Sequence, residues 1–148
     1  MKATGAMYQN ILVALENSRA DQSLLSHIEK LATLLRARLL LVHVADGWVA
    51  RHFERLKLAE SEEMKADRHY LETTAEKLRA AGLQVTTRLA LGDPPVEILN
   101  IATAENCDLI AMTTHGHGLI GDIIHGSTIE PVRHRAMIPL LIVRATNL

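Results

Sequence analysis

Short runs of consecutive apolar residues alternate along this chain with segments whose apolar residues recur every three or four positions. Continuous apolar runs are typical of strands that are covered on both faces, as in a parallel sheet. Such runs predict strands at residues 10–15, 38–44, 108–113 and 139–143. Residues 83–91 alternate apolar with polar positions, which predicts a half-covered or edge strand.

The segments between these strands carry the periodicity of amphipathic helices. Helices are predicted at residues 24–35, 56–81, 94–106 and 128–135. Gly82 provides a stop for the second helix, because glycine is common just after a helix end. Asp93 is a suitable N-cap for the third helix, with Pro94 at its first position.

The resulting order of strands and helices predicts an α/β fold, a single doubly wound parallel sheet with helices on both faces. Sheets of this kind bind ligands beyond the carboxyl ends of their strands, where the strand order reverses. If strands one and four flank that reversal, residues 16–18 and 113–114 face each other across the crevice.

Length and composition favour one globular domain, here residues 7–148 after a flexible leader at residues 1–6. The chain has 148 residues and a net charge of −1, so no electrostatic field draws it to nucleic acid or to an anionic membrane. No apolar run approaches the ~20 residues that span a bilayer, and no signal peptide is evident. A cytoplasmic location is therefore expected. The single cysteine, Cys107, is expected to be a small buried residue.

A glycine-bearing loop at residues 113–128 lies between the fourth strand and the last helix. This arrangement builds phosphate sites, because glycines let the backbone approach an anion and the helix start offers N–H groups. Ser127 and Glu130 also have the spacing of a capping box. No lysine follows Gly126, so the loop is not a P-loop. The residues alone leave a phosphate cradle and an ordinary structural loop both open.

The loop does not carry the dinucleotide-binding fingerprint either. Glycines at positions 116, 118 and 121 match its internal spacing, but that fingerprint belongs to the first strand–helix turn of a fold. The loop histidines, His115, His117 and His125, with Asp122, are weak evidence for a metal, so none is predicted. His43, within an apolar strand, is interpreted as a structural histidine, and no residue spacing suggests a catalytic triad.

Several of these features occur together in one known family. After the fourth strand, Gly116 is separated by nine residues from Gly126-Ser127, which meets the end of a G-x2-G-x9-G-[ST] pattern. Residues 11–18 and 40–44 and the turn Gly92-Asp93-Pro94 add to the match. From about residue 8 to residue 144 the chain resembles a universal stress protein. The resemblance implies a five-stranded parallel sheet in the order 3-2-1-4-5.

The resemblance also implies a site for an adenine nucleotide, ATP or AMP, with or without Mg²⁺. Glu16 would contact the adenine, Val44 would offer its backbone to the base, and Met112 and Thr113 would lie against the adenosine. The phosphates would be held by Gly116, Gly126, Ser127 and Thr128.

Four positions depart from the family pattern. Thr113 replaces the first motif glycine, Glu16 replaces an aspartate and Asn17 replaces a glycine. Asp122 occupies a position that is often basic, and it would repel a triphosphate unless a cation bridges the two. These departures predict weaker nucleotide binding. If the Thr113 side chain obstructs the adenosine, Thr113→Gly should improve binding.

The function that the resemblance implies is a nucleotide-dependent sensor or adaptor in the stress response. The alternative is a dimeric interaction module of the same fold that binds no nucleotide. An enzyme is the third possibility, but no general base is evident beside the loop, so at most slow ATP hydrolysis is expected.

A homodimer through strand five is also predicted. With the family sheet order, the apolar run at residues 139–143 lies at a sheet border. Apolar edge strands with unpaired N–H and C=O groups invite pairing with another strand, and a two-fold axis would satisfy both copies. Dimers through this region are common in the family that the chain resembles.

Overall fold

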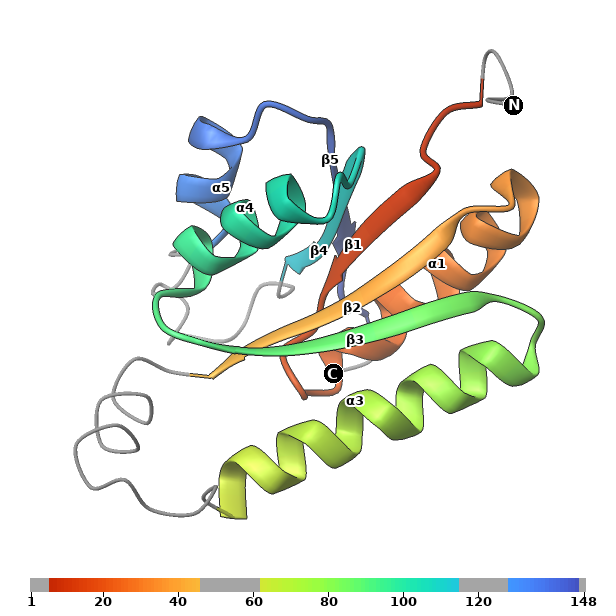
Figure 1. Cartoon of the computed structure of the whole chain (residues 1–148), viewed down its shortest axis with the longest axis horizontal. Coiled ribbons are helices and arrows are strands. Elements are labelled where there is room, and N and C mark those ends of the chain that lie inside the picture. The colour runs from red at the N-terminus through yellow and green to blue at the C-terminus, as the bar shows by residue number, and fades with distance from the viewer. Residues whose placement is uncertain (1–5, 46–61, 115–127, 147–148) are drawn as a thin grey trace.

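The computed structural model describes residues 6–45, 62–114 and 128–146, which form a five-stranded parallel sheet between two layers of helices (Figure 1). The strand order is β3-β2-β1-β4-β5, and every neighbouring pair is parallel, as the sequence predicted. The strands are β1 (Asn10–Ala14), β2 (Arg38–Ala45), β3 (Gln84–Leu91), β4 (Leu109–Thr114) and β5 (Leu140–Arg144).

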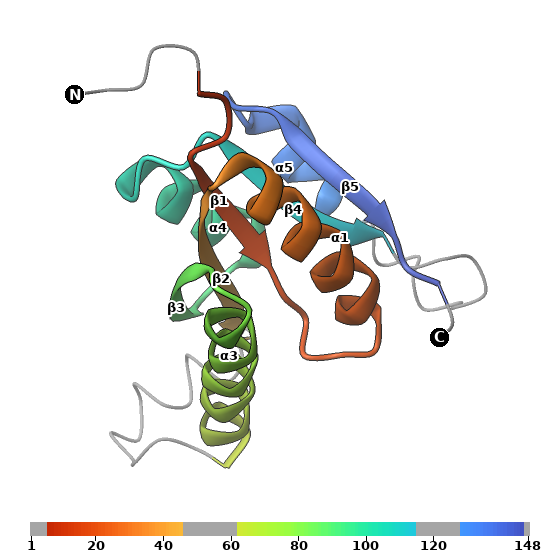
Figure 2. The same ribbon diagram turned by 90° about the vertical axis from the view of Figure 1, so that its right-hand side faces the viewer.

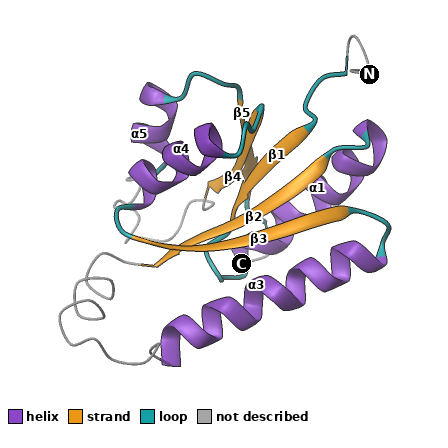
Figure 3. Cartoon of the chain, viewed as in Figure 1, coloured by secondary structure: helices purple, strands orange, loops and turns teal. Residues whose placement is uncertain are grey.

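Helices and strands alternate along the described chain, as Figure 3 shows by colour. The helices are α1 (Ala20–Leu35), α3 (Glu62–Ala80), α4 (Pro94–Ala104) and α5 (Ile129–Arg135). Helices α1 and α3 cover one face of the sheet, and α4 and α5 cover the other. In Figure 2, α1 lies in front of the sheet and α4 and α5 lie behind it. The prediction of helices on both faces is confirmed.

The central strand β1 shows why its sequence is continuously apolar. Ile11 and Val13 pack toward α1 and α3, whereas Leu12 and Ala14 pack toward α4, and all four are buried. Successive side chains of a strand point to opposite faces, so a strand between two helix layers needs apolar residues at every position. Each large side chain buried in this way contributes about 1.5–3 kcal/mol to folding.

The edge strand β3 also follows its sequence pattern. Val85 is buried against α3, whereas Gln84, Thr86 and Arg88 are exposed. Polar residues occupy the face of β3 that no helix covers fully, which is the half-covered environment that the alternation predicted.

The boundaries of the elements agree with the expected ones to within a few residues. Gly82 follows α3 with φ +97°, a left-handed conformation that favours glycine, and Asp93 is the N-cap of α4 with Pro94 after it. The Asp93 side chain makes no capping hydrogen bond, so Asp93 supports the start of α4 only through its extended backbone conformation. The expected start of α3 at residues 56–61 and most of the predicted leader lie outside the described residues.

Cys107 is buried, as expected, with 7% of its surface exposed. Burial, together with the nearby carboxylates of Glu105 and Asp108, raises the pKa of its thiol to about 11. Within the described ranges, no helix is long and apolar enough to cross a membrane.

Candidate functional site

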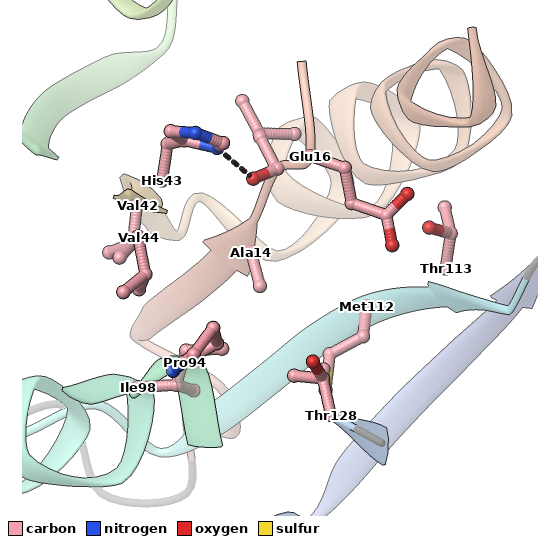
Figure 4. Close-up of a pocket in the computed structure, with 11 residues that line it drawn as sticks. Ala14, Glu16, Val42, His43, Val44, Pro94, Ile98, Met112, Thr113 and Thr128 are labelled. Atoms are coloured by element: carbon pink, nitrogen blue, oxygen red, sulfur yellow. Dashed lines mark hydrogen bonds between the residues drawn. The ribbon is translucent and has the colours of Figure 1, made fainter. Parts of the chain in front are cut away.

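A pocket of about 210 Å³ opens at the carboxyl ends of β1, β2 and β4 (Figure 4). The strand order reverses here, because β2 lies on one side of β1 and β4 lies on the other. Doubly wound sheets bind ligands at such a reversal, beyond the carboxyl ends of the strands. The pocket is lined by Ala14, Leu15, Glu16, Val42, His43, Val44, Pro94, Ile98, Met112, Thr113 and Thr128.

A larger hollow of about 340 Å³ lies at the opposite, amino ends of the strands. Its lining includes the first residues of three strands, Asn10, Arg38 and Gln84. The carboxylate of Glu105, which also lines it, is paired with the guanidinium of Arg88. The hollow lies at no reversal of strand order, so we take the smaller pocket as the candidate site.

One part of the candidate pocket is apolar. Val42 and Val44 occupy alternate positions of β2 and therefore point to the same face of the sheet, toward α4. Ile98 and Pro94 approach from α4, and Met112 approaches from β4. Apolar side chains from β2, α4 and β4 therefore form a slot, and this slot suits a flat, weakly polar ring such as a nucleobase.

The other part of the pocket is polar and is formed by Glu16, Thr113 and Thr128 (Figure 4). Glu16 is exposed and follows β1, whereas Thr128 is half-buried and is the N-cap residue of α5. Thr113, on β4, is only 4% exposed, and its hydroxyl oxygen is buried without a hydrogen-bond partner among the described residues. A buried hydroxyl without a partner is costly, so Thr113 is a less favourable residue here than an apolar one of the same shape.

The turn that carries Glu16 is held by a buried carboxylate on α1. Asp21 is fully buried, and its oxygens accept hydrogen bonds from the backbone N–H groups of Glu16 at 2.9 Å and Asn17 at 2.8 Å. The hydroxyl of Tyr70, on α3, donates to the same carboxylate at 2.6 Å. Burial, and then the hydrogen bond to Asp21, raise the pKa of Tyr70 well above its usual value. These bonds fix the backbone that presents Glu16 to the pocket.

A second polar network joins β2 to α3 beside the pocket. The Nδ1 atom of His43 lies 2.8 Å from the carbonyl oxygen of Leu15, shown by the dashed line in Figure 4. A carbonyl only accepts hydrogen bonds, so Nδ1 carries a proton. The other ring nitrogen lies 3.3 Å from the carboxylate of Asp67, which also accepts a hydrogen bond from the side chain of Asn17 at 2.8 Å. His43 is a satisfied structural histidine, as the sequence indicated.

Asn17, where the family resemblance implies a glycine, has a conformation that glycine also adopts. Its φ is +61°, in the left-handed region that glycine adopts easily and that asparagine tolerates better than most residues. Asparagine therefore fits this position at small conformational cost, and its side-chain amide donates a hydrogen bond to Asp67.

The structure brings together five of the predicted site residues around one pocket: Glu16, Val44, Met112, Thr113 and Thr128. Glu16 and Thr113 lie across the crevice from each other, as predicted for residues that flank the reversal of the strand order (Figure 4). The other three, Gly116, Gly126 and Ser127, lie outside the described residues, as do the loop histidines.

The predicted capping box also falls partly outside the described residues, because it requires Ser127. Within the described part, the carboxylate of Glu130 accepts a hydrogen bond from Arg133 at 2.7 Å. This bond lowers the pKa of Glu130.

Sequence reasoning predicted Val44 and Met112 but missed the rest of the apolar lining of the pocket, and it missed both polar networks. Pro94 was assigned to a turn and helix start, and Ile98 to the helix, but neither was assigned to the site. Both could have been expected there, because α4 starts at the carboxyl end of β3. Asp21, Tyr70 and Asp67 had no detectable signal, because each partner lies on a different element.

The chain belongs to the universal stress protein family, whose sequence model matches residues 7–144. It is 28% identical to universal stress protein MJ0577 of Methanocaldococcus jannaschii, over 95% of this chain and 98% of that relative. It is 31% identical to a universal stress protein of Thermus aquaticus, over 93% of this chain and all of that relative.

Solved structures of related proteins have the same fold. The structure of MJ0577 superposes with a TM-score of 0.79 at 28% identity and covers 96% of this chain and 99% of its own. A universal stress protein in complex with cAMP covers 95% of this chain and 99% of its own, with a TM-score of 0.69 at 19% identity. One from Archaeoglobus fulgidus in complex with dAMP covers 93% and 98%, with the same TM-score and identity. At this identity the likeness of the last two shows the fold alone.

Proposed function

We propose that this protein binds an adenine nucleotide, ATP or AMP, in the pocket at the carboxyl ends of β1 and β4 and acts as a sensor or adaptor in the stress response. The observation that carries the proposal is the pocket itself. It combines an apolar slot with a polar part formed by Glu16, Thr113 and Thr128, at the point where the strand order of the described sheet reverses. Two structures of the same fold contain cAMP or dAMP.

In this proposal the base enters the apolar slot, where the side chain of Val42 and the backbone of Val44 lie beside it. The phosphates extend toward Thr128 and the loop before it, which contains Gly116, Gly126 and Ser127. Mg²⁺ would offset the charge of Asp122 when the ligand is a triphosphate. No residue is assigned as a general base, so ATP turnover at this site would be slow.

Isothermal titration calorimetry with ATP, ADP, AMP and cAMP, each with and without Mg²⁺, tests the proposal. Saturable binding of at least one of them with a 1:1 stoichiometry per chain is the expected result. Absence of binding at millimolar nucleotide would overturn it and favour the alternative, a dimeric interaction module that keeps the fold without the ligand.

Ser127→Ala tests the phosphate assignment. A hydrogen bond to a charged phosphate contributes about 1.5–3 kcal/mol, so affinity should fall about 10- to 150-fold. Gly126→Val should weaken binding further, because a side chain there would block the approach of backbone N–H groups. Ser26→Ala, at an exposed position of α1, is the matched control and should bind as the unmodified protein does. An affinity unchanged by Ser127→Ala would place the phosphates elsewhere.

We also propose that the protein is a homodimer through β5. This strand is at the edge of the sheet, Ile142 on it is 38% exposed, and Met137 just before it is 96% exposed. Ile142→Lys should convert the dimer into a soluble monomer, because two lysines would meet across the two-fold axis. Leu34→Lys, at an 80% exposed position of α1, is the control. If light scattering of the unmodified protein gives only the chain mass of 16.3 kDa at tens of micromolar, there is no such dimer.

A further inference from the structure

The hollow of about 340 Å³ at the amino ends of the strands arises because α4 is short. Strands β2 and β3 have 8 residues each, which is about 27 Å of strand. Helix α4 has 11 residues, which is about 16 Å of helix. In Figure 1 the amino ends of β2 and β3 extend to the right, past the end of α4. The hollow lies where α4 no longer covers this face of the sheet.

The polar side chains of the hollow form a row across three strands. Arg38 on β2 is the register partner of Asn10 on β1 and of Gln84 on β3. Register partners share a face, and neighbouring strands lie about 4.8 Å apart, so the Arg38 guanidinium and the Gln84 amide are able to bind one ligand group. The Asn10 amide already donates to the carbonyl oxygen of Asn106 at 3.2 Å. The side chains of Arg38 and Gln84 have no hydrogen-bond or ion-pair partner among the residues that the structure describes.

The hollow carries one positive charge that no described residue neutralises. Glu105 is the one acid among its described lining residues, and this carboxylate is paired with the guanidinium of Arg88. Arg38 is therefore available for an anion of a single charge. A phosphate group suits the hollow less well, because it carries about −1.5 to −2 charges. The carboxyl end of α4, which has a partial negative charge, also lies at the hollow through its C-cap residue Glu105.

The hollow also offers apolar surface to a ligand. Leu40 and Cys107 line it and are 9% and 7% exposed. The pKa of the Cys107 thiol is raised to about 11 by burial, so the side chain is uncharged at neutral pH. The volume of the hollow is at the small end of the range of ligand pockets, which is roughly 300–1,000 Å³. A compact ligand with one charged end and an apolar body matches these features.

We infer that this hollow binds a small organic acid through a single carboxylate. The Arg38 guanidinium donates two parallel hydrogen bonds to the carboxylate oxygens, and the Gln84 amide donates a third. The apolar body of the acid lies against Leu40 and Cys107. This site is at the opposite end of the strands from the proposed nucleotide pocket, so it does not depend on nucleotide binding. The same chemistry occurs on a free acid and at the C-terminus of a peptide.

A titration of the whole ¹⁵N-labelled chain, followed by NMR, tests the inference and distinguishes the two sources. The probes are hexanoate and N-acetyl-leucine, which resembles a peptide C-terminus. Saturable shifts are expected at the amides of residues 10–11, 38–40, 84–86 and 105–107. Hexanamide has the same length without the charge and should bind at least about 10-fold more weakly than hexanoate. Tighter binding of hexanoate indicates a free acid, and tighter binding of N-acetyl-leucine indicates a peptide end.

Three variants at exposed positions show which groups are responsible. Arg38→Gln should lower the affinity for hexanoate about 10- to 150-fold, because hydrogen bonds to a charged group are lost. Arg36→Gln removes the same charge outside the described lining of the hollow, so it is the matched control and should change the affinity by less than about 2-fold. Thr86→Trp keeps Arg38 but fills the hollow from its lining, so it should abolish binding. Circular dichroism checks that each variant is folded, as expected for surface changes.

The absence of saturable shifts with both acids at millimolar concentrations would overturn the inference. An affinity for hexanoate that survives Arg38→Gln or Thr86→Trp would also overturn it, as would equal binding of hexanamide. Inorganic phosphate that binds to the hollow more tightly than both acids would show that the class of anion is wrong. A parallel titration with AMP tests the nucleotide pocket, and failure of AMP to bind overturns the proposed function but not this site.

Discussion

The hydrogen bond between Tyr70 and Asp21 is the contact whose removal we expect to have the clearest effect on stability. Asp21 is fully buried, and its carboxylate holds the turn after β1 through backbone N–H groups. The hydroxyl of Tyr70, which lies on α3, donates a hydrogen bond to the same carboxylate at 2.6 Å. Tyr70→Phe keeps the ring and its packing and deletes only this bond.

The expected cost follows from the charge and burial of the acceptor. A hydrogen bond to a charged group contributes about 1.5–3 kcal/mol, and loss of one donor leaves a fully buried carboxylate undersolvated. For a domain of this size, each kcal/mol corresponds to roughly 2–4 °C in Tm. Tyr70→Phe should therefore lower Tm by roughly 3–12 °C.

Thermal and urea unfolding, followed by circular dichroism, measure the effect. Tyr8→Phe is the matched control, because Tyr8 also packs against the core, while no hydrogen bond of its hydroxyl is found in the described part of the chain. It should shift Tm by less than about 2 °C, since a surface change away from special contacts costs within about 0.5 kcal/mol. The reasoning is refuted if Tyr70→Phe and Tyr8→Phe unfold at the same temperature and urea concentration as the unmodified protein.

Two other predictions concern stability and reactivity. Burial and neighbouring carboxylates raise the pKa of the Cys107 thiol from 9.0 to about 11. At pH 8 the fraction of Cys107 in the thiolate form should therefore be about 100-fold lower in the folded protein than in the unfolded chain. The rate of reaction with a disulfide reagent should be lower by the same factor, because the thiolate is the reactive form. The unfolded thiol ionises first as pH rises, so the free energy of unfolding should fall between pH 9 and about 11, and this Cys107 contribution should be missing in Cys107→Ala. Gly92 has φ +139° and an added Cβ would lie 3.1 Å from Glu97 Oε1, so Gly92→Ala should cost about 1–3 kcal/mol in urea unfolding. Gly82→Ala, at φ +97° with no atom within 4 Å of an added Cβ, should cost less, and the reverse order would contradict the steric argument.

The sequence by itself determined the sheet and its layers. A strand between two helix layers must be apolar at every position, and an edge strand must alternate, so β1 and β3 could be recognised by pattern alone. Because helices alternate with strands along the chain, neighbouring strands were expected to be parallel. Short, right-handed connections between them then allowed only a few strand orders. The position of the pocket followed from that topology, because the carboxyl ends of parallel strands meet at one edge of the sheet.

Only the tertiary structure decided which side chains meet at the pocket. Tyr70 and Asp21 are 49 positions apart, and the carboxylate of Asp67 reaches both His43 on β2 and Asn17 in the turn after β1. Hydrophobic periodicity shows which face of an element is buried, but it carries no information on which polar group lies opposite. Thr113 illustrates the difference, since its sequence position marked it only as an obstruction. Its burial without a hydrogen-bond partner in the described structure depends on the packing of β4 against β1 and α1, which no local pattern encodes.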